Sequence, residues 1–126
     1  MLDSTCGEAS PTPSRRRPGA APSPADQHLR RIIEHTVSPA FAIGRAALWS
    51  HTRGPPAEAF ARQVAMYLAH VGLGLSLGTV ARLFARDRTT VAHACALIED
   101  RRDAVSFDRS LDLLEAAMHL AVRRQS

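Results

Sequence analysis

The sequence predicts an all-α fold, a compact bundle of five to six short helices that contains a helix-turn-helix. From residue 26 onward, apolar residues recur every three to four positions, which is the period of an amphipathic helix. No segment shows the strict alternation of apolar and polar residues that is typical of a half-buried strand. A length of 126 residues allows one domain with a modest core.

Residues 1–25 are predicted to form a disordered tail. They are rich in Ser, Thr, Pro, Gly and Ala, and they contain few large apolar side chains, so burial cannot offset the entropy of ordering them. The basic run at residues 15–17 either adds sequence-independent contacts to phosphates or is simply solvated. The folded domain is expected to span residues 26–124.

Three helices are expected before residue 72. Asp26 can cap the first, and Pro39 should end it, because proline inside a helix removes a hydrogen bond and clashes with the preceding turn. A short second helix follows, and the third begins at Pro56 and is ended by Gly72 and Gly74, which tolerate a left-handed C-cap. The apolar residues of the three helices are Leu29, Ile32, Ile33 and Val37, then Ile43, Ala46, Ala47, Leu48 and Trp49, then Phe60, Val64, Leu68 and Val71.

The helix-turn-helix is expected between residues 76 and 102. Ser76 can cap its first helix, and Asp87 can cap the second by accepting from the backbone N–H of Thr89 or Thr90. The apolar residues that should face each other are Leu77, Val80, Ala81 and Phe84 on the first helix and Val91, Ala94, Cys95 and Ile98 on the second. A last helix, capped by Ser106, should complete the core. Its apolar side consists of Phe107, Leu111, Leu114, Met118 and Ala121.

The outward face of the second helix of this pair is polar at its start and acidic at its end. Its outward residues are Thr89, His93, Ala96 and Asp100. Near its far end, Glu99, Asp100 and Asp103 would repel phosphate, whereas a helix N-terminus attracts anions. If this helix enters a DNA groove, it should therefore do so with its N-terminus first.

The charge balance favours a polyanionic partner, nucleic acid first and an anionic membrane second. The formal net charge is +4 and the pI about 10.4, and all 16 basic residues are Arg. A Walker A loop needs a Lys, so a P-loop ATP site is excluded and no cofactor is expected. No apolar run approaches the ~20 residues of a membrane span, and no signal peptide is evident, so we expect a cytoplasmic, nucleoid-associated protein without a membrane partner.

The sequence offers no catalytic or metal-binding constellation. Cys6 and Cys95 are far apart, which fits a reducing cytosol, and His93 and Cys95 face different sides of one helix. No spacing matches a zinc site, and no Ser-His-Asp triad or pair of carboxylates is evident. We therefore expect a protein that is not an enzyme, and we assign Trp49, Met66, Tyr67 and Met118 to the core.

The segment ARQVAMYL, followed by GLSL and then FARDRTTVAHACALIE, resembles the C-terminal DNA-binding domain (domain IV) of the bacterial replication initiator DnaA. The resemblance covers about residues 26–124 and is strongest from Arg62 to Glu99. It implies a helix-turn-helix of the Trp-repressor-like type that binds a short asymmetric site in double-stranded DNA, the DnaA box, as a monomer. The nucleotide-binding and assembly domains of DnaA have no counterpart in this sequence, so we expect a stand-alone DNA-binding domain that does not bind ATP.

The resemblance also implies roles for individual residues. Residues 87–90 would contact bases in the major groove. Arg62 and Gln63, which we expect to point away from the apolar stripe of their helix or to its edge, would lie at the DNA surface. Residues 76–77 would contact the DNA backbone, and Arg53 is what remains of a basic loop that reaches the minor groove. The complete set of expected DNA-binding residues is Arg53, Arg62, Gln63, Ser76, Leu77, Arg86, Asp87, Arg88, Thr89, Thr90 and His93.

The sequence departs from the family pattern at the expected base-contacting turn. Arg88 stands where the family has His, and its planar fork of donors matches O6 and N7 of guanine. The turn before it is one residue shorter and lacks the family's glycines. Asp87 either accepts from a base amino group or caps the helix, and Arg62, Arg82 and Arg86 would neutralise phosphates.

Two hypotheses of function follow. The first is a sequence-specific double-stranded DNA-binding protein that acts in transcription regulation or in the control of replication initiation. The alternative is a helical adaptor that kept the fold but binds a protein, which the reduced basic loop and the acidic helix end favour. Retention of a protein partner without DNA affinity would separate the second from the first.

Overall fold

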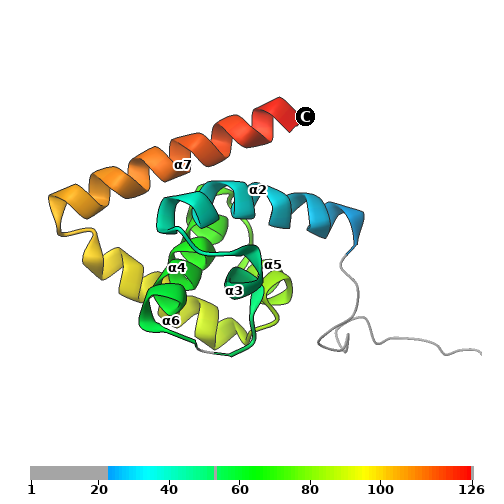
Figure 1. Ribbon diagram of the computed structural model, residues 1–126, viewed down its shortest axis with the longest axis horizontal. Helices are drawn as coiled ribbons and strands as arrows, with labels where there is room; N and C mark the ends of the chain where they lie inside the picture. The colour runs from blue at the N-terminus through cyan, green and yellow to red at the C-terminus, as the bar shows by residue number, and fades with distance from the viewer. Residues whose placement is uncertain (1–22, 53, 126) are drawn as a thin grey trace, which may run out of the picture.

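The computed structural model describes residues 23–52 and 54–125, which form a bundle of helices (Figure 1). In chain order these are α2 (Pro24–Phe41), α3 (Arg45–Trp49), α4 (Pro56–Tyr67), the π-helix η2 (Leu68–Gly72), α5 (Leu77–Phe84), α6 (Arg88–Arg101) and α7 (Val105–Gln125). The described residues contain no strand, so the predicted all-α fold is confirmed. Across residues 23–52 and 54–125, every helix is too short or too polar to cross a bilayer.

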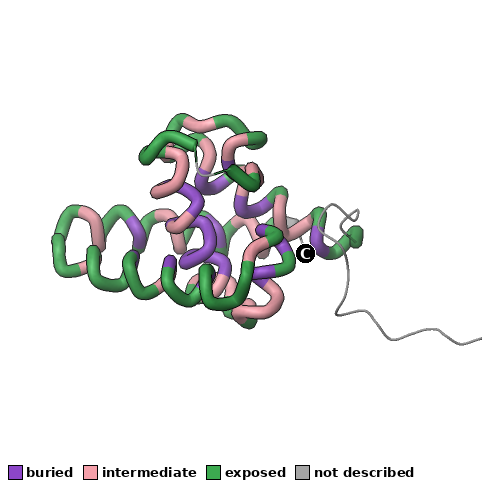
Figure 2. The backbone as a smooth tube through the Cα atoms, turned by 90° about the horizontal axis from the view of Figure 1, so that it is seen from below, coloured by how far each residue is buried: buried purple, intermediate pink, exposed green. Residues whose placement is uncertain are grey.

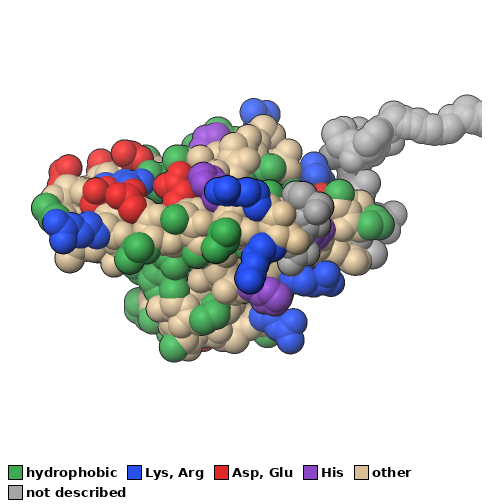
Figure 3. All heavy atoms as spheres, turned by 90° about the horizontal axis from the view of Figure 1, so that it is seen from above, with side chains coloured by type: hydrophobic (Ala, Val, Ile, Leu, Met, Phe, Trp, Pro, Cys, Tyr) green, Lys and Arg blue, Asp and Glu red, His purple; other side chains and the backbone are tan. Residues whose placement is uncertain are grey.

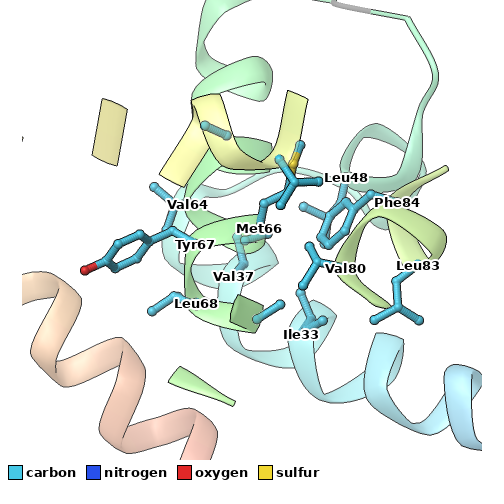
Figure 4. Close-up of a cluster of buried hydrophobic side chains, with 14 of the residues drawn as sticks. Ile33, Val37, Leu48, Val64, Met66, Tyr67, Leu68, Val80, Leu83 and Phe84 are labelled. Carbon is cyan, nitrogen blue, oxygen red and sulfur yellow. The ribbon is translucent and has the colours of Figure 1, made fainter. Parts of the chain in front are cut away.

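Helix α4 is the centre of the bundle. It packs against α2, α3 and α6, while α7 lies along α2 and η2 (Figure 1). Every helix turns its buried residues inward (Figure 2). In the core, side chains from α2, α3, α4, η2 and α5 converge, with Val37, Met66 and Val80 near the middle (Figure 4). Met66, Tyr67 and Met118 are buried as predicted, and Trp49 packs against the core from its edge.

Helix α2 extends beyond the predicted limits at both ends. Its N-cap is Ser23, whose hydroxyl accepts from the backbone N–H of Asp26 at 3.1 Å, and Pro24 occupies the first turn. The prediction that Asp26 caps this helix is therefore wrong. Pro39 does not end it either: the helix continues to Phe41 without the hydrogen bond that Pro39 cannot donate, and the N–H of Ala42 closes it on the carbonyl oxygens of Ser38 and Pro39.

The side chain of Asp26 instead ties α2 to the helix-turn-helix. Its two carboxylate oxygens accept from Nε and Nη2 of Arg82 at 3.2 and 2.9 Å. Arg82, which we expected to neutralise phosphates, is thus engaged by a carboxylate of its own chain. The hydrogen bonds from Arg82 hold the pKa of Asp26 below its usual range, although burial acts in the opposite direction.

This ion pair predicts a dependence of stability on pH. Because the pKa of Asp26 is lower in the folded chain than in the unfolded chain, its contribution is present above the unfolded pKa and is lost as the pH falls below about 4. Asp26→Asn should lower the free energy of unfolding at pH 7 by about 1 kcal/mol, a modest figure because Arg82 is half exposed and water screens the pair. Urea unfolding at pH 7 and pH 3 checks this, and an equal difference at both pH values would contradict it.

The segment between α4 and α5 differs from the prediction that Gly72 and Gly74 simply end the helix. The chain widens into the π-helix η2, and Gly72 lies inside this turn without a positive φ. A Cβ on Gly72 would meet Cγ of Glu115 at 3.3 Å, so glycine here allows α7 to approach. Gly74 does adopt the left-handed conformation, with φ 73°. The widened turn leaves Val71 46% exposed, outside the predicted apolar stripe.

A polar cluster joins α4, α6 and α7. Tyr67 donates to a carboxylate oxygen of Glu99 at 2.8 Å and accepts from Nη1 of Arg102 at 2.9 Å. The same guanidinium also donates to Asp108 and to Asp112. These bonds raise the pKa of Arg102, and burial raises the pKa of Tyr67. The cluster fixes the corner at which α7 turns back over the bundle.

Helix α7 covers the bundle with the face that the sequence predicts. Its residues Leu111 and Met118 are fully buried, and Phe107, Leu114 and Ala121 pack against the core. Its start differs, because the backbone N–H of Asp108 already donates to Ala104 O at 2.9 Å, which places Ser106 inside the first turn. The predicted cap at Ser106 is therefore wrong.

Candidate nucleic-acid interface

Helices α5 and α6 form the predicted helix-turn-helix. Ser76 caps α5, with its hydroxyl accepting from the backbone N–H of Thr79 at 3.1 Å, as predicted. The helix ends at Ala85, which is left-handed with φ 55°, and the N–H of Arg86 closes the turn by donating to Ala81 O at 2.9 Å. A left-handed Ala costs roughly 1 kcal/mol that glycine would avoid, so the shortened turn is held by the packing on both sides.

The inner face of α6 is apolar and holds the helix on α4 and α5. Val91, Ala94 and Ile98 are buried as predicted, and Cys95 is half-buried. Burial raises the pKa of the Cys95 thiol, which keeps it neutral near pH 7. This packing leaves the opposite face of α6 in solvent, including His93.

The start of α6 presents an exposed polar tip, Asp87–Thr90. All four residues are exposed, and their side chains form no hydrogen bond with any residue in the described part of the chain. Asp87 does occupy the N-cap position, and its backbone carbonyl accepts from Val91 N at 3.1 Å. Its carboxylate makes no cap hydrogen bond, however, so the predicted capping by this side chain is wrong.

Arg62 is not at the surface. It is 4% exposed, and its Nε and Nη2 donate to the carbonyl oxygen of Ala47 at 3.3 and 3.2 Å. The expectation that Arg62 points away from the apolar stripe and lies at the DNA surface is therefore wrong. The physical reason is that α3 is a single turn whose carbonyls need donors, and the guanidinium of α4 supplies them. Gln63, its neighbour, is half-buried.

Arg86 is also engaged within the chain. Its Nη2 donates to the carbonyl oxygen of Ser50, which lies just after α3, while its Nε is buried and has no hydrogen-bond partner among the described residues. This contact brings the connection between α3 and α4 next to the start of α6. No local pattern indicated a role for Ser50, because its partner lies 36 residues away.

The remaining residues that we expected to contact DNA lie on α5, on α6 or outside the described part of the chain. Ser76 is exposed and Leu77 is half-buried against the core, both at the start of α5. His93 lies one turn beyond the tip on α6. Arg53 falls outside the described residues, as do residues 15–17.

The charges along α6 are polarised. Acidic side chains gather at the corner where α6 ends and α7 begins (Figure 3). At this corner Asp100 and Asp103 are exposed, whereas Asp108 and Asp112 are paired with Arg102. The opposite end of α6 carries the exposed tip with its Arg88. This distribution favours the approach of a polyanion to the N-terminus of α6.

Comparison with known proteins identifies the family of this helix-turn-helix. A family model described as the bacterial dnaA protein helix-turn-helix matches residues 31–98. A solved structure titled "Crystal structure of DNA replication initiation factor" is similar, with a TM-score of 0.66 and 31% sequence identity, and the match covers 74% of this chain. It covers 28% of that protein, so this chain corresponds to only a part of the initiation factor. No curated protein matches this sequence. Since the family model covers more than half of the chain, this protein belongs to the DnaA-type family of DNA-binding helix-turn-helix domains.

Proposed function

We propose that this chain binds double-stranded DNA in a sequence-selective manner, with the tip of α6 in the major groove, and acts in transcription regulation or in the control of replication initiation. The observation that carries the proposal is the tip, Asp87–Thr90, which is exposed and makes no side-chain hydrogen bond within the described chain. Four hydrogen-bonding side chains with no internal partner, at the positive end of a helix dipole, suit an anionic partner whose base edges present donors and acceptors.

Each residue of the tip has a chemical role in this proposal. The guanidinium of Arg88 donates to O6 and N7 of guanine, the most common base-specific contact. The hydroxyls of Thr89 and Thr90 hydrogen-bond to a base edge, and their methyl groups contact thymine. The carboxylate of Asp87, which does not cap the helix, accepts from an amino group of cytosine or adenine.

The flanking residues would set the orientation of α6 on the duplex. Ser76 and Leu77 lie at the start of α5, Gln63 lies on α4 and His93 lies on the next turn of α6. Contacts from such positions to the sugar-phosphate backbone fix the register without selecting a sequence. We propose that residues 26–124 are the binding unit and that one copy occupies one asymmetric site without ATP.

Fluorescence anisotropy with a DnaA-box duplex and a scrambled duplex of the same length tests the proposal. We expect the DnaA-box duplex to bind at least about tenfold more tightly, with an affinity that falls as salt rises, because bound phosphates release counterions. Equal, weak binding to both duplexes would remove the claim of selectivity. Absence of DNA binding together with stoichiometric retention of a protein partner after DNase treatment would favour the protein adaptor.

A further inference from the structure

We propose that Arg62 and Arg86 are positioning residues of the DNA interface: from within the protein they hold residues 50–52 and 54, in the connection between α3 and α4, at a fixed distance from the tip of α6. This inference rests on the proposed function. It replaces the role in phosphate binding that the sequence indicated for these two arginines. It also means that the connection and the tip would meet DNA as one surface with a set spacing.

The first anchor is Arg62, which fixes the point where the connection leaves α3. Its guanidinium is buried and donates twice to Ala47 O, the carbonyl that also accepts from Ser50 N at 3.4 Å. Because Arg62 lies in the middle of α4, whose neighbours Ala61 and Val64 are fully buried, it cannot move without disturbing the core. The end of α3 is therefore tied to the central helix.

The second anchor is Arg86, which fixes the next residue of the connection to the helix-turn-helix. It directly precedes the tip, and its Nη2 donates to Ser50 O. The hydroxyl of Ser50 in turn accepts from Thr52 N at 3.1 Å and lies 2.8 Å from the hydroxyl oxygen of Thr52. A shift of Arg86 would thus be passed on to Ser50 and Thr52 together.

At its far end, the connection lies close to two charged side chains of α4, Glu58 and Arg62, as the surroundings of Gly54 show. Its φ of 67° favours glycine, and a Cβ at this position would lie 2.8 Å from a carboxylate oxygen of Glu58 and 3.9 Å from Nη2 of Arg62. The connection therefore passes directly over the side chains that anchor it. Any other residue at position 54 would strain the backbone at this positive φ and displace the carboxylate of Glu58.

The arrangement places two positive charges close together, which is electrostatically unfavourable. The positive charge of Arg86 lies close enough to lower the pKa of Arg62 after the effect of burial, and Glu58 opposes this change. In addition, Nε of Arg86 is buried without a hydrogen bond among the described residues. The hydrogen bonds of the two arginines nevertheless fix where the carbonyl oxygens of Ala47 and Ser50 lie.

The connection between α3 and α4 carries exposed side chains that can contact DNA. His51 and Thr52 are exposed, and they lie beside the residue that leads into the tip. Their contacts would fall on nucleotides next to those that the tip contacts. The positioning by Arg86 would therefore determine how strongly the protein distinguishes duplexes that differ only in these flanking base pairs.

Arg86→Met tests the inference, with Arg45→Met as the control. The control removes the same charge from an exposed residue of α3, whose side chain is 74% exposed and lies 3.9 Å from Glu34. In the free protein we expect amide hydrogen exchange at residues 51, 52 and 54 to become at least about tenfold faster in Arg86→Met only. On the selected duplex we expect about tenfold weaker binding and loss of preference for flanking base pairs, with the preference at the tip's base pairs retained.

Gly54→Ala provides a second variant that changes no charge. It should produce the same loss of flanking preference, and combining it with Arg86→Met should add little, because both act on one segment. Unchanged amide exchange and unchanged flanking preference in both variants would overturn the inference, as would an equal loss in Arg45→Met. Failure of the unmodified chain to bind any duplex would overturn the proposed function itself, which distinguishes the two failures.

Discussion

Arg88→Ala should abolish most of the preference for the selected duplex. We expect its affinity for that duplex to fall roughly ten- to hundredfold, because a bidentate contact to guanine contributes about 1–3 kcal/mol of discrimination. Affinity for a scrambled duplex should change much less. The melting temperature should not change, since Arg88 is exposed and its side chain makes no hydrogen bond within the described chain. Anisotropy titrations and thermal melts measure the two effects separately.

A matched control separates base recognition from simple loss of charge. Arg109→Ala removes one positive charge from an exposed position on α7, on the acidic side of the molecule. It should leave the ratio of the two affinities unchanged. If Arg88→Ala lowered binding to both duplexes by the same factor, Arg88 would be a phosphate contact and the assignment of base contact would be wrong.

Ile98→Ala should cause the largest loss of stability among the changes considered. Ile98 is completely buried on the inner face of α6, where that helix packs on α4. Its truncation leaves a cavity and should lower the free energy of unfolding by about 2–5 kcal/mol. That is a large share of the roughly 5–15 kcal/mol that stabilise a typical domain. Urea unfolding followed by circular dichroism measures it.

The neighbouring residue provides the control for this prediction. Leu97 lies on the same helix and is 36% exposed, so Leu97→Ala should change the free energy of unfolding much less, by about 1 kcal/mol or below. Equal losses at both positions would mean that α6 is not packed as described. Because the tip is the first turn of this helix, a loosened α6 should also weaken DNA binding.

The helices could be predicted from the sequence because their signal is local. The apolar period located α3, α5, α6 and α7, although not the start of α7, and the N-cap Ser76 and the first helical residue Pro56 were evident from residue type alone. Buried residues such as Ile98 and Met118 followed from the same period. Periodicity identifies a face of a helix, and in a small bundle that face is almost always the one that is buried.

The arginines could not be placed in this way, because their partners are distant in sequence. Arg62, Arg86 and Arg82 bind groups 15, 36 and 56 residues away. A guanidinium can donate to a phosphate, a carboxylate or a backbone carbonyl, so residue type alone does not identify its partner. Only the tertiary structure, which brings α3 next to α4 and brings Asp26 and Ser50 next to the helix-turn-helix, shows that these three are engaged within the chain.

The helix ends show a similar limit. Ser23 and Pro24 are a good cap and first residue, but they lie in a segment whose composition indicated a tail. Pro39 lies inside the last turn of a helix that ends two residues later, so the proline alone did not mark the helix end. The widening at residues 68–72 leaves no mark in the period of the apolar residues.

The central claim is that the first turn of α6 meets the bases of DNA, and an NMR titration of the labelled protein with a DnaA-box duplex tests it most directly. We expect the largest amide shifts at residues 87–93, with smaller ones at the start of α5 near Ser76. Shifts confined to the outward side of α7, around Leu113 and Leu120, would contradict it, as would no shift at all.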